Sequence, residues 1–265
     1  MPLNSVTSGG LNETDRGGGI IVSKLCFRAF LGRWIFVFLG ELLLGEGYAA
    51  VPAHFTDTSL FSVGGPTALA FTPDGRMLIA TQGGALRVYQ NEQLLATPAL
   101  SFTSSRICTN RDQGLLGIAV DPNFVANNRI YLYYTAATPS CFNRVSRFTL
   151  PTSNVINPAS EVILLKNIPS PNAQHDGGDL GFGKDGYLYV SVGDGGCDYR
   201  ADSGCGGSND AARDRNTLLG KILRITKDGA IPPRNPFLGA NTARCQNGNS
   251  APGLICQETF AWGLR

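Results

Sequence analysis

The sequence predicts an all-β fold, a β-propeller built of four-stranded blades, from three observations. The 265 residues include 33 Gly and 15 Pro but only 16% charged residues, a balance typical of short strands joined by tight turns. The hydrophobic fraction of 43% suffices for a core and excludes a disordered chain. One strand–turn–strand pattern also recurs along the chain, which indicates a repeat architecture.

The recurring pattern is an apolar strand, a tight turn and a second strand of alternating character. Leu69–Ala80 reads LAFTPDGRMLIA and Leu180–Ser191 reads LGFGKDGYLYVS, so the two segments align position for position on the same plan and share the Leu, the Phe and the Asp-Gly turn. Leu116–Tyr134 follows the same plan with a longer Asp-Pro-Asn turn. Each segment therefore predicts a β-hairpin. A further strand is expected after each hairpin, at Ala85–Tyr89, Arg144–Thr149 and Lys221–Ile225.

The spacing of the hairpins favours a propeller over a β-sandwich. Phe71, Val120 and Phe182 occupy equivalent places, so the repeats lie 49 and 62 residues apart, as in blades of four strands. Residues 54–265 have room for about 3.5–4 such blades, the last beginning near Glu258. Because a closed ring rarely stops within a strand-like run, we interpret the chain as a C-terminally truncated, larger propeller.

Residues 1–53 are predicted to be an N-terminal extension that contains a secretory signal. Basic residues lead into the apolar run Trp34–Gly40, and small residues follow at 49–53, the order found in signal peptides. Glu41 interrupts the run, so a buried helix or a misassigned start remains an alternative.

The formal charge of +2 argues against a nucleic-acid partner. No stretch of about 20 residues is apolar throughout, which argues against a stable membrane span. We expect a secreted or periplasmic protein.

Seven cysteines support export. Cys26 lies in the predicted leader, and six remain, in three neighbouring couples. An even number in an exported chain indicates disulfides, and no Cys-x-x-Cys spacing supports a metal site instead. The hypothesis is three bonds, Cys108–Cys141, Cys197–Cys205 and Cys245–Cys256.

The candidate catalytic pair is His175 with Asp194. The chain has only two histidines, which excludes a His-rich zinc site, and it lacks nucleotide-binding and nucleophile-elbow motifs. His175 precedes the first strand of the third repeat, whose leading loop reaches the channel mouth of a propeller, where an imidazole could act as a general base. Asp194 ends the next, antiparallel strand, so both side chains lie at one rim and the carboxylate could orient the ring. A surface histidine and a turn-capping aspartate are the alternatives.

The segment from Asp194 to Asp214 is rich in aspartate. Five aspartates occur in it, but the spacing and closing Glu of an EF-hand are missing. A solvated loop is favoured over a calcium site, and the metal ligands stay unknown.

Around His175 and Asp194, and in several other stretches, the sequence resembles the soluble glucose/sorbosone dehydrogenases that depend on pyrroloquinoline quinone (PQQ), including the aldose sugar dehydrogenases. The matching stretches, in family order, are Gly114–Phe124, His175–Gly186, Tyr189–Asp194, Leu218–Arg224, Asp228–Pro232 with Asn235-Pro236, and Ala261–Arg265. The resemblance implies a six-bladed propeller that oxidises an aldose or related sugar at its C1 hydroxyl. His175 falls on the family's catalytic base and Asp194 on the carboxylate that holds it.

Three further residues fall on the family's cofactor site. Arg265 matches an arginine near the cofactor, although the Asn-Pro that follows it in the family is absent here. Asp112 and Gln174 occupy columns in which other members carry Gln and Asp. The resemblance also implies an active-site calcium ion, with ligands from a later blade, and an external electron acceptor. We therefore expect this chain alone not to oxidise sugar.

Two other functions remain open at this point. One is a non-catalytic propeller that binds a protein partner, because Hedgehog-interacting proteins share these blades. The other is a carbohydrate-binding propeller without redox chemistry. Neither needs His175, Asp194 and Arg265 together, so their joint presence favours the enzyme.

Overall fold

The computed structural model describes residues 52–197 and 210–265. The chain divides into two compact units, Met1–Asp57 and Thr58–Arg265. The predicted signal segment lies outside the described residues, and the fold described below is that of the second unit. No helix in the described segments is long and apolar enough to cross a membrane.

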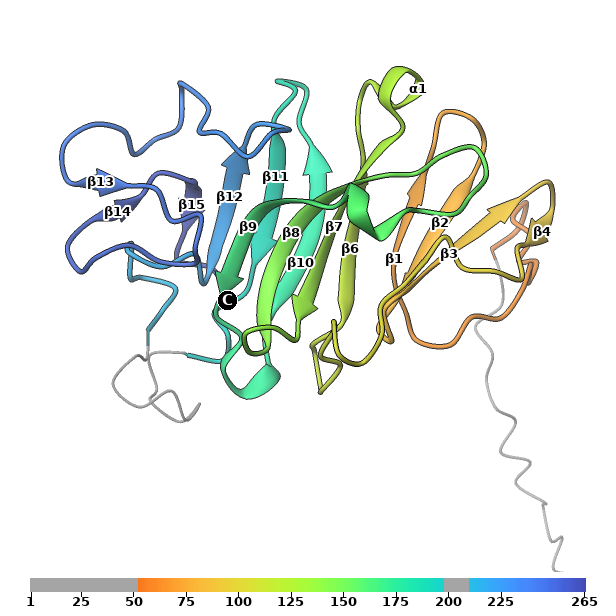
Figure 1. Ribbon diagram of the computed structural model, residues 1–265, viewed down its shortest axis with the longest axis horizontal. Coiled ribbons are helices and arrows are strands. Elements are labelled where there is room, and N and C mark those ends of the chain that lie inside the picture. The colour runs from red at the N-terminus through yellow and green to blue at the C-terminus, as the bar shows by residue number, and fades with distance from the viewer. Residues whose placement is uncertain (1–51, 198–209) are drawn as a thin grey trace, which may run out of the picture. The chain divides into compact units, whose positions relative to one another are not determined.

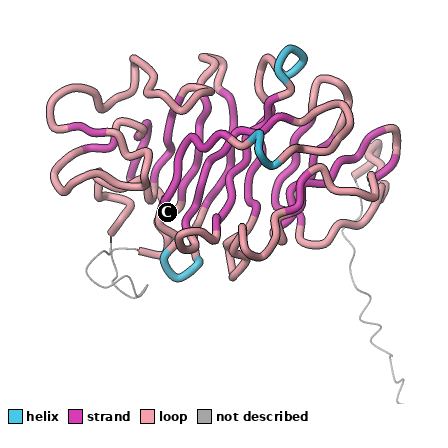
Figure 2. The backbone as a smooth tube through the Cα atoms, in the orientation of Figure 1, coloured by secondary structure: helices cyan, strands magenta, loops and turns pink. Residues whose placement is uncertain are grey.

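The second unit consists mainly of antiparallel sheets, with very little helix (Figures 1 and 2). The first sheet contains β1 (Pro66–Phe71), β2 (Met77–Thr81), β3 (Ala85–Gln90), β4 (Gln93–Leu94) and β5 (Leu100–Ser101). The second contains β6 (Leu115–Val120), β7 (Arg129–Ala136), β8 (Phe142–Thr149) and β9 (Val162–Ile168). The third contains β10 (Gly177–Phe182), β11 (Leu188–Val192), β12 (Lys221–Ile225) and β15 (Thr259–Trp262). A small parallel pair joins β13 (Thr242–Ala243) to β14 (Ile255–Cys256).

Helical structure in the described residues is limited to short turns. These are α1 (Phe124–Asn127), η1 (Pro158–Ser160) and η2 (Pro171–Ala173). The sequence predicts a plain turn where α1 lies. There the Asp121 carboxylate accepts the Asn123 N–H at 2.8 Å and starts the single helical turn.

The three predicted hairpins and the strands after them are confirmed. β1–β2, β6–β7 and β10–β11 pair antiparallel, and β3, β8 and β12 continue each sheet. The prediction for the last strand was wrong in its partner. Residues 259–262 were interpreted as the beginning of a fourth blade, but β15 pairs with β12 and completes the third. Three blades, rather than 3.5–4, are therefore present in the described part of the chain.

The second sheet is buried on both faces. Along β7, Tyr131 and Tyr133 enter one apolar cluster with side chains of the third sheet. The intervening Ile130, Leu132 and Tyr134 enter another with side chains of the first sheet. Because successive strand residues point to opposite faces, one strand contributes to both cores.

The first strands of the three sheets lie side by side, β6 between β1 and β10, as expected around a propeller axis. The approach of β6 to β10 is so close that a Cβ added to Gly117 would lie 1.8 Å from the Gly178 carbonyl oxygen. Only glycine fits at this position.

Two of the predicted disulfides are present. Cys108–Cys141 and Cys245–Cys256 join Cα atoms 5.8 and 5.3 Å apart. Cys197 is also disulfide-bonded, while Cys205, the partner predicted for it, lies outside the described residues.

Candidate active site

His175 lies in the short segment between η2 and β10. Its backbone is left-handed, with φ of 51°, and Asn172 and Ala173 before it have φ of 59° and 54°. Residues other than glycine rarely adopt this conformation, and such strained positions cluster at functional sites. The His175 side chain is 33% exposed, so the ring is held by the protein and still accessible.

Asp194 meets His175 because β10 and β11 pair in register. Gly177 lies opposite Val192, so the residues two positions beyond each strand end, His175 and Asp194, face each other. His175 Nδ1 is 2.8 Å from Asp194 Oδ1. A carboxylate oxygen accepts hydrogen bonds, so in the neutral ring Nδ1 carries the proton and Nε2 is an acceptor. The structure thus brings the two residues together as the sequence predicts.

The Asp194 carboxylate is itself fixed by its surroundings. Its side chain is 2% exposed, and Oδ1 also accepts the Gly196 N–H at 2.8 Å. A Cβ added to Gly193 would lie 1.9 Å from the His175 carbonyl oxygen. The Gly193–Gly196 segment therefore uses glycine to let the Asp194 loop approach the His175 backbone.

Asp112 contacts the His175 backbone. Its Oδ2 accepts the His175 N–H at 2.8 Å, and its own N–H donates to the Ala173 carbonyl oxygen at 3.1 Å. Asp112 is exposed, and Gln174 is half-buried next to the histidine. The family resemblance gives both a place near the cofactor, and Asp112 additionally holds the backbone from which the imidazole projects.

A buried polar chain on the other side of His175 was missed from the sequence. Asp176 is 2% exposed, and its Oδ1 accepts from Asn143 Nδ2 at 2.6 Å. Asn143 Oδ1 accepts from the Thr135 hydroxyl at 2.7 Å, and the Tyr133 hydroxyl donates to the Asp176 carbonyl oxygen at 2.9 Å. Burial raises the pKa of Asp176, and the negative charge of Asp112 adds to that rise.

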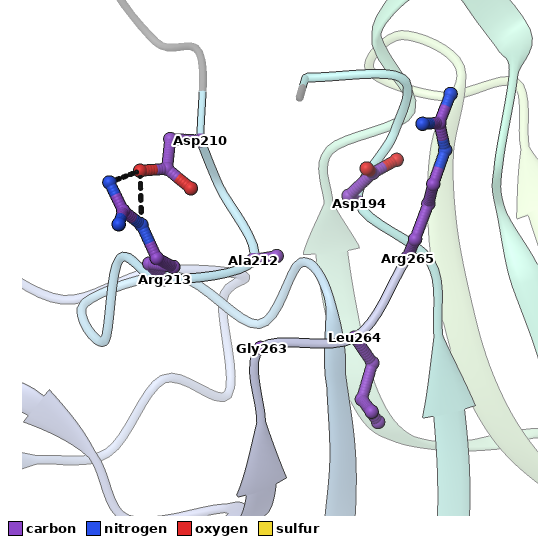
Figure 3. A pocket seen from close by; sticks show the side chains of 7 residues that line it. All are labelled: Asp194, Asp210, Ala212, Arg213, Gly263, Leu264 and Arg265. Atoms are coloured by element: carbon purple, nitrogen blue, oxygen red, sulfur yellow. Dashed lines mark hydrogen bonds and ion pairs between the residues drawn. The ribbon is translucent and has the colours of Figure 1, made fainter. Parts of the chain in front are cut away.

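Two neighbouring cavities open at this rim. The first, about 470 Å³, is lined by His175, Gly193, Lys221 and Arg265 among others. The second, about 400 Å³, lies between Asp194 and Arg265 on one side and the Asp210–Arg213 ion pair on the other (Figure 3). Arg265 lines both, so the structure places the predicted cofactor arginine at the same cavity as the histidine.

Lys221 supports the wall of the first cavity from inside. Its side chain is buried, and Nζ donates to the carbonyl oxygens of Leu219, Ala211 and Ala212 at 2.6, 3.0 and 3.0 Å. Burial lowers the pKa of this amine to about 8. The family motif indicated the residue but not this role.

No group of three or more His, Cys, Asp or Glu side chains gathers to hold a metal within residues 52–197 and 210–265. Asp210 of the aspartate-rich segment pairs with Arg213, and residues 198–209 lie outside the description. The described residues therefore do not fit a calcium site.

Comparison with known proteins identifies the family. The Glucose / Sorbosone dehydrogenase family matches residues 63–246. Aldose sugar dehydrogenase YliI of Escherichia coli is 30% identical over 189 residues, which are 68% of this chain and 46% of that protein. An oxidoreductase (glucose dehydrogenase) of Thermus thermophilus has a TM-score of 0.62 and 31% identity, over 77% of this chain and 53% of that one.

A third relative contains the cofactor. The PQQ-bound aldose sugar dehydrogenase of Streptomyces coelicolor has a TM-score of 0.55 and 28% identity, over 67% of this chain and 49% of that one. The chain thus spans about half the length of these relatives. Its repeated hairpins, its histidine–aspartate pair and its match over residues 63–246 lead to one conclusion: the chain belongs to the glucose/sorbosone dehydrogenase family.

Proposed function

We propose that this chain carries the catalytic base of a PQQ-dependent oxidoreductase that oxidises an aldose or related sugar at its C1 hydroxyl. The observation that carries the proposal is the 2.8 Å contact between His175 Nδ1 and Asp194 Oδ1 at the wall of a cavity. With Nδ1 engaged, Nε2 is the nitrogen left to accept a proton.

In this mechanism His175 removes the C1 hydroxyl proton through Nε2. Asp194 keeps the ring in the required tautomer and orientation and stabilises the imidazolium that forms. Imidazole side chains suit this step because they exchange protons near neutral pH. General base catalysis of this kind raises the reaction rate by about 10²–10⁴-fold. PQQ, when bound, supplies the acceptor for the hydride, and turnover also needs an external electron acceptor.

The residues present fit part of a PQQ site. PQQ is a polyanionic quinone, and the Arg265 guanidinium lines the cavity that also contains His175. A cavity of about 470 Å³ is within the ordinary range for small ligands. We propose Arg265 as a cofactor contact, with Asp112 and Gln174 at the edge of the same site. No step is assigned to calcium, because the described residues supply no ligand set for it.

The disulfides support an exported protein. Cys108–Cys141 and Cys245–Cys256 are typical of an oxidising compartment. We therefore propose that the enzyme acts in the periplasm or outside the cell on a small sugar.

The test measures sugar-dependent dye reduction, with PQQ and calcium added, in the longest product that the gene encodes. His175→Ala is expected to lower kcat by about 10²–10⁴-fold while the affinity for PQQ, followed by absorbance, changes little. His54→Ala, at the other histidine of the chain, is the matched control and should retain activity. Full activity in His175→Ala would remove the mechanism.

A second assay addresses residues 1–265 alone. We expect no sugar oxidation by this chain, because its described residues contain no calcium site and Arg265 is the one cation described at the His175 cavity apart from the carbonyl-bound Lys221. Turnover by the isolated chain would contradict that expectation and leave the role of His175 standing. Tight sugar binding without oxidation in every form would instead favour a binding propeller.

A further inference from the structure

The His175 backbone is held on both sides by hydrogen bonds. Its carbonyl oxygen accepts the Gly195 N–H at 3.2 Å, and its N–H donates to Asp112 Oδ2 at 2.8 Å. A left-handed histidine is strained unless its surroundings fix it, and these two contacts fix the peptide groups on either side of its Cα. Asp112 and Gly195 therefore each hold one of the two peptide groups that flank the His175 Cα.

Asp112 belongs to a loop that touches the histidine segment at three points. Besides the His175 contact, the Asp112 N–H donates to the Ala173 carbonyl oxygen at 3.1 Å. The neighbouring Gln113 donates through Nε2 to the Ser170 hydroxyl at 2.8 Å. The start of the second blade thus binds the segment that precedes the third.

The Asp112 loop is itself anchored. Gln82, the residue directly after β2, donates through Nε2 to the carbonyl oxygens of Arg111 and Gln113. The Gln113 N–H closes a turn onto the Asn110 carbonyl oxygen at 2.8 Å. The Asp112 carboxylate is therefore presented by a braced turn, although its side chain is exposed. Because hydrogen bonds hold the turn that carries Asp112, its carboxylate can restrain the His175 N–H.

We propose that Asp112 is a positioning residue, which holds His175 in the left-handed backbone conformation that the contact with Asp194 requires. The inference rests on the proposed role of His175 as the base, and it concerns how the chain sets that base before any substrate arrives. Asp112 acts through the His175 peptide group and takes no proton in the reaction.

The experiment reads the tautomer of His175 directly. The chain has two histidines, His54 and His175, so selective ¹⁵N labelling of histidine gives two sets of ring signals in a long-range ¹H–¹⁵N correlation spectrum. A neutral ring with its proton on Nδ1 is distinguished from one with its proton on Nε2. The spectra are recorded at a pH where both rings are neutral.

The wild-type chain should show His175 mainly with its proton on Nδ1. Asp112→Ala removes the acceptor, and His175 should then shift toward the Nε2–H form, while His54 is unchanged. Asp112→Asn keeps an oxygen that can accept the same N–H and should resemble the wild type. Asp57→Ala, which removes an exposed carboxylate, is the control and should change neither ring. If Asp112→Ala does not fold, Asp112→Ser, whose hydroxyl is too short to reach, replaces it.

Two results would overturn the proposal. One is an Asp112→Ala chain that keeps the wild-type Nδ1–H tautomer. The other is an Asp112→Asn chain that behaves like Asp112→Ala, because charge and not the hydrogen bond would then control the ring. In the cofactor-loaded enzyme, Asp112→Ala should lower kcat by up to about 10²-fold with little change in KM, and Asp112→Asn should restore most of it.

The tautomer measurement separates this proposal from the proposed function. A tautomer shift in Asp112→Ala together with unchanged activity in His175→Ala would refute the enzymatic mechanism and keep the positioning role. An unchanged tautomer together with lost activity in His175→Ala would do the reverse.

Discussion

Asp176 lies next to the candidate catalytic base but affects the stability of the fold. Its side chain is almost completely buried between the second and third sheets, where Asn143 donates to it at 2.6 Å. Burial raises its pKa, because an ionised carboxylate loses hydration there. The folded chain therefore binds the Asp176 proton more tightly than the unfolded chain does. The stability associated with this group is complete at low pH and is lost as the pH rises through the folded-state pKa.

We expect Asp176→Asn to stabilise the chain at pH 7. The amide oxygen can still accept from Asn143, and the buried charge is gone. The gain in unfolding free energy should be on the order of 1 kcal/mol at pH 7 and should shrink as the pH falls, because protonation then removes the buried charge from the wild type as well. Urea titrations at pH 4, 5.5 and 7 measure it, with the exposed Asp179→Asn as control. A variant that is less stable than the wild type at all three pH values would show that the carboxylate itself is needed.

At the residue scale, the sequence predicts one half of the site. The meeting of His175 and Asp194 follows from hairpin pairing alone, because antiparallel register fixes which residues lie opposite each other. The Asp112 contact and the Asp176 chain do not follow from it. Both depend on how one blade packs against the next, and the polar Thr135 and Asn143 lie within strands buried on both faces, where period-two alternation carries no information.

Strand β12 connects the candidate site to the rest of the third blade through Lys221. β12 begins with Lys221, whose buried amine donates to three carbonyl oxygens, two of them in the 211–212 segment that borders the cavities. Burial lowers the pKa of this amine to about 8, well below its usual value. Between pH 8 and about 10.4 the folded chain therefore binds fewer protons at Lys221 than the unfolded chain, and stability increases with pH over that range.

We expect Lys221→Met to cost about 2–3 kcal/mol of unfolding free energy at pH 7, because buried carbonyl oxygens lose their donor. The difference in unfolding free energy between the wild type and the variant should increase between pH 8 and pH 10, because only the wild type gains stability from Lys221 over that range. Denaturant titrations at pH 7, 8.5 and 10 test both parts, with the exposed Lys184→Met as control. A difference between wild type and Lys221→Met that stays constant with pH would mean that the Lys221 amine is charged throughout.

At the element scale, strands that belong to the repeat are predictable and the others are not. β1, β2, β6, β7, β10 and β11 follow from the shared hairpin pattern, and β3, β8 and β12 follow from the further strand expected after each hairpin. β9 has no counterpart in that pattern, and β15 is separated from β12 by more than thirty residues containing the Cys245–Cys256 disulfide. Because local sequence does not say which edge such a strand joins, its partner was assigned wrongly.

For the molecule as a whole, the sheets pack through two cores, and the middle sheet contributes to both. The repeat predicts this stacking, whereas the six-bladed ring is known only from the family. The outward side of β1, at one edge of the first sheet, is not covered in the second unit, whereas Ile79, the β2 partner of Leu69, is buried. Leu69 and Phe71 of β1 are 58% and 71% exposed, while the alternate residues Ala68 and Ala70 pack on the core. Neighbouring exposed apolar side chains of this kind mark surfaces that another surface can cover.

Replacing these two side chains tests whether that face is open in solution. Leu69→Ser combined with Phe71→Ser should change the unfolding free energy by no more than about 0.5 kcal/mol each, because both side chains are already exposed. The binding of a hydrophobic fluorescent dye and the tendency to self-associate in sedimentation should both decrease. Leu78→Ala, at a fully buried position of β2, should instead cost about 2–5 kcal/mol. If the double variant loses several kcal/mol, or binds as much dye as the wild type, the β1 face is covered in solution.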